Sequence, residues 1–227
     1  MHDTLCIIPA RGGSKGVPFK NRRIVGGAPL ISHTIRSARA AMLLSTIVVT
    51  TDDPEIAQIA EAEGVEAIER PSALATDESP VIDAIRHVLA VRGEAGMAAP
   101  EAIALLQPTS PFRQPQDIDA ALELYFANGG CPVCSVYQTD DAHPARMYRI
   151  IEGRLQSLMP ELASVRRQDL PPIYHRNGSI YVFGQREVAS GQIIVDRMLP
   201  YVMPLTSSVN VDSETDLLLV QAMMERQ

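Results

Sequence analysis

The chain lacks any long apolar run. Its 227 residues contain no stretch that approaches the roughly 20 apolar residues a membrane-spanning helix requires. Residues 1–20 also lack the apolar core and the small-residue cleavage site of a signal peptide. We therefore expect a cytoplasmic protein without a membrane partner.

Basic residues are in the minority. The chain has 20 Lys and Arg against 27 Asp and Glu, a formal net charge of -7. A general nucleic-acid binder requires an exposed basic face, so no nucleic-acid partner is expected. Cysteine is scarce too: there are three, of which Cys131 and Cys134 have C-x-x-C spacing. No paired histidine motif completes a zinc site, and no catalytic triad is evident, so nucleophilic Ser or Cys catalysis is unsupported.

Against this acidic background, one segment contains no acid at all. The apolar run Leu5–Ile8 predicts a buried parallel strand, and Pro9 ends it. A glycine-rich loop follows, with three glycines and five cations: Gly12, Gly13, Gly16, Arg11, Lys15, Lys20, Arg22 and Arg23. Flexible backbone beside fixed positive charge, at the carboxyl end of a strand, suits the phosphates of a nucleotide.

This loop differs from two common phosphate loops. It lacks the G-x-x-x-x-G-K-[ST] order of a P-loop, and the chain contains no G-x-G-x-x-G. Both a P-loop NTPase and a Rossmann dehydrogenase are therefore disfavoured.

The rest of the chain mostly alternates between strands and helices. Apolar or β-branched runs predict strands at 46–51, 65–68, 102–106 and 133–138. Helical spacing, with its start and stop signals, predicts helices at 29–42, 54–63, 80–92 and 115–128. This order predicts an α/β fold with a parallel sheet and right-handed crossovers.

The alternation breaks between Thr139 and His175, where short apolar pieces are separated by prolines and charges. MYRIIEGRLQSL predicts a hairpin that turns at Glu152 and Gly153. Regular pattern then returns with a strand at 179–183, a short helix near 186–189, a strand around 201–203 and a terminal helix from Ser213. We expect one domain, 1–227, in which 139–175 is an insertion that packs on a second subunit.

Five motifs, in order, carry a resemblance to a known family. They are IIPARGGSKGVPFKN, TTDDPEIA, LLQPTSPFR, RNGSIY and VNVDSETDL. Together they resemble the acylneuraminate cytidylyltransferases, the CMP-sialic acid synthetases. The resemblance implies a three-layer αβα nucleotide-diphospho-sugar transferase (Rossmann-like) fold with a mostly parallel sheet. It also implies a homodimer, in which the insertion covers the partner's sugar site.

The implied reaction is attack of the anomeric hydroxyl of a nonulosonic acid, an acidic nine-carbon sugar, on the α-phosphate of CTP. Pyrophosphate leaves. The resemblance makes Arg11, Lys20 and Asp212 the candidate catalytic residues. The candidate nucleotide-binding residues are Ala10, Arg11, Gly12, Gly13, Ser14, Lys15, Lys20, Asn21, Arg70 and Ser79. Solvent exposure remains the alternative for Lys15 and the favoured interpretation for Arg22 and Arg23.

The candidate metal ligands for Mg²⁺ or Mn²⁺ are Asp212 and Asn210. The family pattern here is two aspartates separated by one residue, so Asn210 departs from it by offering a neutral oxygen. Capping of the last helix is the alternative for Asp212 and Ser213. Capping is also the preferred interpretation of Glu214 and Asp216, and of Asp52 and Asp53, where metal binding is the minority hypothesis.

The candidate sugar-binding residues are Gln107, Arg146, Arg167, His175, Arg176 and Asn177. A sugar carboxylate calls for cations and amides. The sequence leaves open whether His175 or Arg176 faces the site. Thr109 and Ser110 are expected to shape the turn after Gln107, and Arg113 to be a cation at a helix start.

Other functions remain open. The same chemistry on legionaminic, pseudaminic or deoxyoctulosonic acid is the nearest alternative. A sugar-1-phosphate nucleotidyltransferase would require additional cations for its acceptor. A catalytically silent nucleotide-binding subunit would be consistent with Asn210 standing in place of an acid.

Overall fold

A computed structural model describes residues 2–14, 16–139 and 142–226. Within these residues, seven strands form one central sheet in the order β11-β7-β10-β6-β1-β4-β5. In chain order these strands are β1 (Thr4–Pro9), β4 (Thr46–Thr51), β5 (Glu66–Glu69), β6 (Ala102–Leu106), β7 (Val133–Thr139), β10 (Ile173–Phe183) and β11 (Leu199–Val202).

Strand β1 lies at the centre of the parallel half, between β4 and β6. Its apolar residues alternate between two cores, because successive side chains of a strand point to opposite faces. Cys6 and Ile8 belong to one core, and Leu5 and Ile7 to the other. Coverage on both faces explains why this strand is continuously apolar in sequence.

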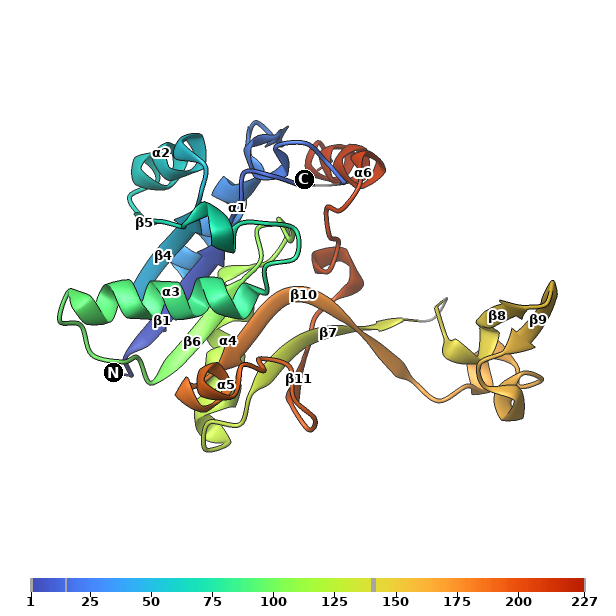
Figure 1. The fold of residues 1–227 in the computed structure, drawn as a ribbon. Coiled ribbons are helices and arrows are strands. Elements are labelled where there is room, and N and C mark those ends of the chain that lie inside the picture. Colours follow the sequence, from blue (N-terminus) through green and yellow to red (C-terminus); the bar gives the residue numbers. More distant parts are fainter. Residues whose placement is uncertain (1, 15, 140–141, 227) are drawn as a thin grey trace.

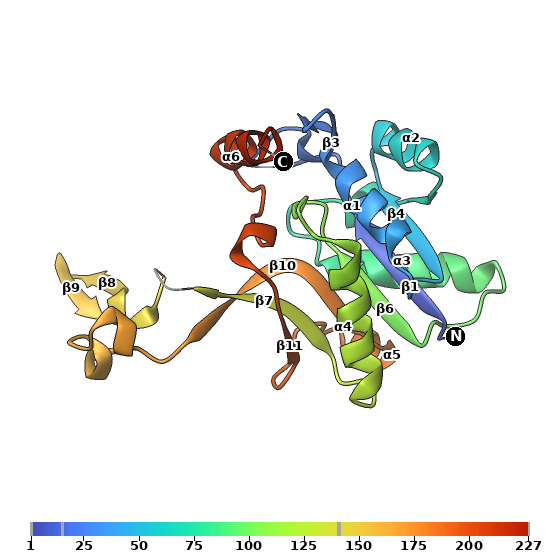
Figure 2. The same cartoon turned by 180° about the vertical axis from the view of Figure 1, so that it is seen from behind.

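Helices cover both faces of the sheet (Figures 1 and 2). Helices α1 (Leu30–Ala40), α2 (Pro54–Ala62) and α4 (Pro115–Ala127) contribute to the first core. Helices α3 (Val81–Glu94) and α5 (Gln185–Ser190) contribute to the second. The expected three-layer αβα fold with a mostly parallel sheet is thus confirmed.

Strand β10 runs antiparallel to both of its neighbours, β6 and β7. Past the ends of β6 and β11, β7 and β10 continue as a two-stranded extension of the sheet. This extension leads to a small hairpin of β8 (Tyr148–Ile151) and β9 (Arg154–Ser157). Figures 1 and 2 both show this hairpin projecting away from the main body. We call residues 142–175 the arm. The predicted hairpin turn is confirmed, since Glu152 and Gly153 both have positive φ, 51° and 75°.

The sequence predicted β10 only from residue 179, whereas it begins at Ile173. Its first half pairs with β7 but not with β6, and residues 174–176 are exposed. A strand without a buried face shows no alternation of apolar and polar residues, so pattern reasoning could not detect it.

A third, smaller core joins the two ends of the chain. Helix α6 (Glu214–Met224) packs Leu217 and Val220 against Val17 and Val25, the latter from a two-stranded hairpin of β2 (Ile24–Val25) and β3 (Ala28–Pro29). The glycine-rich loop and the segment before α6 are thereby brought side by side. Among the described residues, no helix has both the length and the apolar character required to cross a membrane.

Candidate active site

A cavity of about 370 Å³ opens at the carboxyl edge of the parallel strands. Its lining comes from the loops after β1, β5 and β6 and from the segment before α6, as expected for an open α/β sheet. Nine predicted site residues lie on its wall: Arg11, Gly13, Ser14, Lys20, Asn21, Arg70, Ser79, Gln107 and Asp212. The two ends of the sequence thus meet at one site.

Arg11 emerges from the end of β1 and forms an ion pair with Asp77, at 2.7 Å between Nη2 and Oδ1. Asp77 belongs to the polar loop that leads to α3, and it also lines the cavity. Asn21 holds the backbone of Arg11 in place, since its Nδ2 donates to the carbonyl of Arg11 at 3.0 Å. Sequence reasoning missed Asp77; the only available signal was an acid in the same loop as Ser79.

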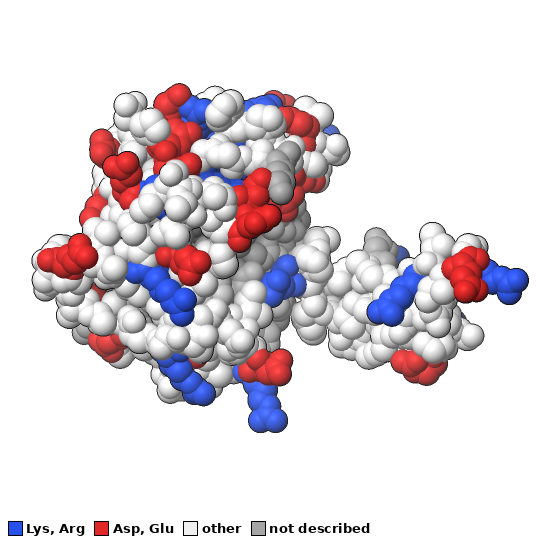
Figure 3. Space-filling view, viewed as in Figure 1, with Lys and Arg blue, Asp and Glu red and all other residues white. Residues whose placement is uncertain are grey.

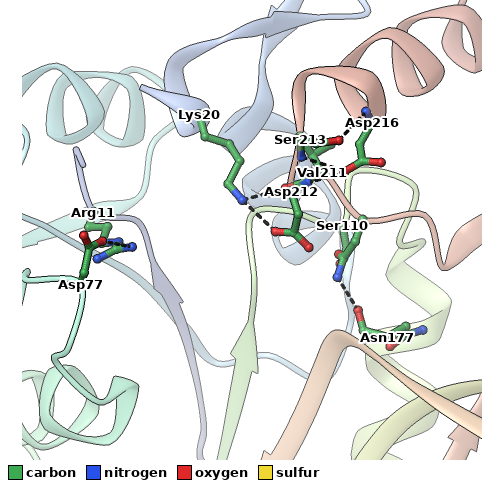
Figure 4. A network of polar contacts seen from close by, with 10 residues as sticks. Arg11, Lys20, Asp77, Ser110, Asn177, Val211, Asp212, Ser213 and Asp216 are labelled. Carbon is green, nitrogen blue, oxygen red and sulfur yellow. Dashed lines mark hydrogen bonds and ion pairs between the residues drawn. The ribbon is translucent and has the colours of Figure 1, made fainter. Parts of the chain in front are cut away.

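Lys20 lies across the cavity from Arg11 (Figure 4). Its Nζ donates to the carbonyl of Val211 at 2.7 Å and to Oδ1 of Asp212 at 2.9 Å. The lysine side chain is 13% exposed, whereas that of Asp212 is 71% exposed. The ammonium is therefore held in place by backbone, while the carboxylate remains accessible.

The glycine-rich loop is fixed at two points. The N–H of Gly12 donates to Oδ1 of Asp52 at 2.9 Å. At Gly16, a Cβ would lie 2.2 Å from the backbone oxygen of Asp212, so only glycine allows this approach. Ala10 is buried directly behind the loop. The prediction for Lys15 lies outside the described residues.

The acids after β4 have structural partners. Asp53 caps α2, accepting from the N–H groups of Glu55 and Ile56.

Arg22 pairs with Asp53 and Glu55 and stacks over the ring of Phe19 at 4.3 Å, so the expectation that it is solvent-exposed is wrong. Arg23 is exposed, as expected, and pairs with Glu214.

Arg70 reaches the cavity from the end of β5 but is itself buried. Its Nη2 donates to the carbonyl of Thr50 at 2.6 Å, and its Nε donates to the hydroxyl of the same residue at 3.3 Å. Burial lowers the pKa of Arg70, although Asp52 opposes that effect. Ser79 organises the neighbouring loop, donating to the carbonyl of Ala73 at 3.1 Å.

A hydrogen-bond chain lies close to Gln107, although its members Ser110, Asn177 and Asn210 are not among the residues that line the cavity. Ser110 donates to Oδ1 of Asn210 at 2.7 Å, and Nδ2 of Asn210 donates to the carbonyl of Asn177 at 2.9 Å. The amide of Asn177 is buried and bonded to Ser135, Ser179 and Ser208. Both asparagines therefore use their side chains to hold protein segments together.

The acidic residues around the start of α6 have different roles. Ser213, not Asp212, is the N-cap of α6, and Asp216 completes the capping box, as the capping interpretation of Asp216 expected. Arg113 stands directly before Gln114, the N-cap of α4, as expected of a cation at a helix start. The sequence did not indicate that it is only 2% exposed and bonds to Ser179 and Thr34.

The remaining predicted sugar residues do not line this chain's cavity. His175 and Arg176 are exposed on the outer part of β10, with the ring of His175 tilted against Tyr137 at 5.3 Å. Arg146 and Arg167 belong to the arm. Figure 3 shows charged arm residues separated from the main body by a narrow neck.

Comparison with known proteins decides the family. Residues 5–198 match the family model described as Cytidylyltransferase.

The chain belongs to the cytidylyltransferase family.

Two curated relatives indicate how specific the similarity is. A CMP-N,N'-diacetyllegionaminic acid synthase of Legionella pneumophila is 34% identical over 97% of this chain and 96% of that protein. An N-acylneuraminate cytidylyltransferase of Escherichia coli is 32% identical over 93% of this chain and 50% of that protein. This cytidylyltransferase family member thus spans about half the length of some relatives and nearly the full length of another.

Solved structures share the fold of this cytidylyltransferase family member. A CMP:2-keto-3-deoxy-manno-octonic acid synthetase complexed with CTP has a TM-score of 0.74 at 19% identity and 99% coverage of both chains. A 4-diphosphocytidyl-2C-methyl-D-erythritol synthase has a TM-score of 0.70 at 15% identity, again covering 99% of both chains.

Proposed function

We propose that this protein transfers a cytidylyl group from CTP to the anomeric hydroxyl of a sialic-type nonulosonic acid, releasing pyrophosphate. One observation carries the proposal. Arg11, Lys20 and Asp212, which are distant in sequence, line a single cavity beside the glycine-rich loop. Family membership supplies the reaction class.

Arg11 and Lys20 lie on opposite sides of the cavity, and we assign both to binding the triphosphate. Arg11 is paired with Asp77, and Lys20 with Asp212. A triphosphate between them exchanges these acids for phosphate oxygens and brings more negative charge than either carboxylate. Because charge grows on the phosphoryl oxygens and on the leaving pyrophosphate, fixed cations stabilise the transition state beyond the ground state. The step requires no covalent enzyme intermediate.

The donor set fits Mg²⁺ or Mn²⁺. Such ions need only one or two protein carboxylates, with phosphate and water completing the shell. Asp212 lines the cavity with its side chain largely exposed, so it would hold the ion. Oδ1 of Asn210 already accepts from Ser110, so a direct bond would have to share this oxygen. When bound, the ion neutralises phosphate charge and orients the triphosphate.

The acceptor would lie near Gln107, and a second copy would complete its site. The arm carries apolar side chains that nothing within this chain covers among the described residues: Tyr148, Ile150, Ile151, Leu155 and Leu158. Such an exposed patch is typical of an interface. We propose a homodimer in which the insertion at 139–175 brings Arg146 and Arg167 to the partner's acceptor, with His175 and Arg176 at the base of the arm.

A specific observation favours legionaminic acid as the alternative acceptor. The legionaminic relative matches along nearly its whole length, whereas the E. coli relative matches along half of it. Legionaminic acid presents the same carboxylate and anomeric hydroxyl as a sialic acid, so the same cavity would serve. The substituents distant from these two groups would decide between them.

The deciding experiment measures pyrophosphate release from CTP and Mg²⁺ with a panel of neuraminic, legionaminic, pseudaminic and deoxyoctulosonic acids. We expect turnover with a nine-carbon acid, identified by mass spectrometry of the CMP-sugar. Arg11→Ala should remove most of this turnover while circular dichroism remains unchanged. Binding of CTP without turnover on any acid would instead support a silent subunit.

A further inference from the structure

The guanidinium of Arg113 is buried beside the acceptor wall. Its Nη1 donates to the carbonyl of Ser179 at 2.7 Å and to the carbonyl of Gln107 at 3.3 Å. Its Nη2 donates to the hydroxyl of Thr34, on α1, at 2.7 Å. Its Nε is buried without a hydrogen-bond partner among the described residues. One side chain thus joins the end of β6 and the middle of β10 to a helix.

These contacts occur where regular strand pairing stops. The β6–β10 ladder includes the pair Leu106 and Ile180, and the next residues along are Gln107 and Ser179. Arg113 donates to both of their carbonyls there, in place of another ladder rung. Beyond that point, β10 changes register against β7, and Gly178 has φ of 73°. Arg113 therefore fixes the strand separation beside the register shift within β10.

The side chain of Gln107 depends on that separation. Its Oε1 lies 3.1 Å from the position that a Cβ on Gly178 would occupy, so amide and glycine backbone are closely packed. Gln107 also lines the cavity, on the wall assigned above to the acceptor. A change in the distance between β6 and β10 would turn or displace this amide.

A structural role alone explains Arg113 poorly. Its partners are neutral oxygens, and burial lowers its pKa to about 10. Burying a charge is costly, and an apolar side chain of similar volume would avoid that cost but would leave the carbonyls of Ser179 and Gln107 without this donor. What an apolar side chain cannot supply is directional donors that set the positions of two carbonyls.

We propose that Arg113 is a positioning residue that holds Gln107 in the orientation required for the acid sugar. This inference rests on the proposed function, because that function assigns Gln107 to the acceptor. CTP binding depends on the opposite walls of the cavity, so Arg113 should affect the acceptor alone.

The test compares three variants of the full chain. Arg113→Met removes all the hydrogen-bond donors of the guanidinium. Arg113→Lys retains the positive charge but loses the planar, multiple-donor geometry of the guanidinium. Thr34→Val removes only the hydrogen bond from Arg113 to α1. We expect kcat/KM for the acid sugar to fall about 100-fold in the two Arg113 variants, while the CTP Kd measured by calorimetry stays within about twofold. Thr34→Val should leave both values near those of the wild type.

Two further measurements separate positioning from folding. In a Gln107→Ala background, Arg113→Lys should have little additional effect on the acceptor, because both changes act on one contact. The side-chain amide signal of Gln107 in the NMR spectrum should shift in Arg113→Lys and remain in place in Thr34→Val. This signal reports on Arg113 even if no acid sugar is turned over.

The inference is overturned if folded Arg113→Lys keeps both the acceptor kcat/KM and the Gln107 signal of the wild type. It is equally overturned if CTP affinity falls in parallel with acceptor affinity. A wild type that processes no acid sugar, yet shows the expected Gln107 shifts, would contradict the proposed function and leave the positioning contact supported.

Discussion

Nζ of Lys20 lies 2.9 Å from Oδ1 of Asp212, although 192 positions separate the two residues. The same ammonium donates to the carbonyl of Val211, so the glycine-rich loop is bonded to the backbone that precedes α6. Figure 4 shows Arg11 with Asp77 on one side and this pair on the other. Segments from near the two ends of the sequence thus form part of the cavity wall, together with the loops after β5 and β6.

Lys20→Met should lower turnover about 10²- to 10³-fold, because it removes a fixed cation aimed at developing phosphate charge. Arg23→Met is a matched control: Arg23 binds Glu214 through two hydrogen bonds, at 2.9 and 3.1 Å, across the same pair of segments but outside the cavity. This exposed pair contributes about 0–1 kcal/mol. Steady-state kinetics and urea unfolding of both variants provide the comparison; equal kinetic losses would contradict the role of Lys20.

Asp212→Asn should raise the Mg²⁺ concentration needed for half-maximal turnover by about tenfold or more, the range found when groups supporting a metal are altered. Folding should be unaffected, because the side chain is 71% exposed. Binding of Mn²⁺ in the presence of CTP, followed by electron paramagnetic resonance, measures the same loss without turnover. Glu214→Gln, which removes a neighbouring charge outside the cavity, serves as control. Unchanged Mn²⁺ affinity in Asp212→Asn would rule out this ligand.

Gly16→Ala should destabilise the contact between the two segments by roughly 1–3 kcal/mol, the usual cost of forcing a group into packed space. The added Cβ would meet the backbone oxygen of Asp212 at 2.2 Å, and backbone cannot rotate away as a side chain would. Gly13→Ala is the control within the same loop, because no heavy atom lies within 4 Å of its Cβ position. Chemical denaturation of both proteins should separate them; similar stabilities would argue against this close approach.

A double substitution in the arm, Ile150→Asp with Leu155→Asp, should convert the proposed dimer into a monomer. These residues are paired across β8 and β9 and are 76% and 70% exposed, so two charges would face the proposed partner. Arg149→Asp with Gln156→Asp adds two acids at the neighbouring pair, on the other face of the hairpin. Sedimentation velocity should show monomers only for Ile150→Asp with Leu155→Asp. This variant should still bind CTP but should lose turnover of the acid sugar.

Asp216 should make α6 acid-sensitive. Burial raises its pKa, but the hydrogen bonds from Asp212 and Ser213 and the charge of Lys20 outweigh that effect, so the pKa is lowered overall. A lowered pKa means that the stabilisation is present above the ordinary value, about 3.9, and is lost as pH falls further. The Tm difference between wild type and Asp216→Asn should shrink as pH approaches 3. A constant difference would mean that Asp216 does not titrate in this range.

The sequence by itself determined the chemistry-bearing loop and most of the elements. Local signals sufficed there: an apolar run for β1, glycine and cations after it, and Asp53 with Pro54 at the start of α2. The ordered motifs placed Arg11, Gln107 and Asp212 at strand ends or helix starts, where an α/β sheet gathers its ligands.

Only the tertiary structure decided which side chains pair and which are buried. The ion pair between Arg11 and Asp77 joins segments that are distant in sequence. The hydrogen bond from Arg113 to the carbonyl of Gln107 depends on burial that no local pattern encodes. The extension of β10 into the arm was hidden because residues 174–176 are exposed and carry no apolar alternation. The antiparallel direction of its buried part depends on the order of the strands in the sheet, which no local pattern encodes. Local composition fixes helices and strands, whereas the contacts that build a site arise only when the strands take their order in the sheet.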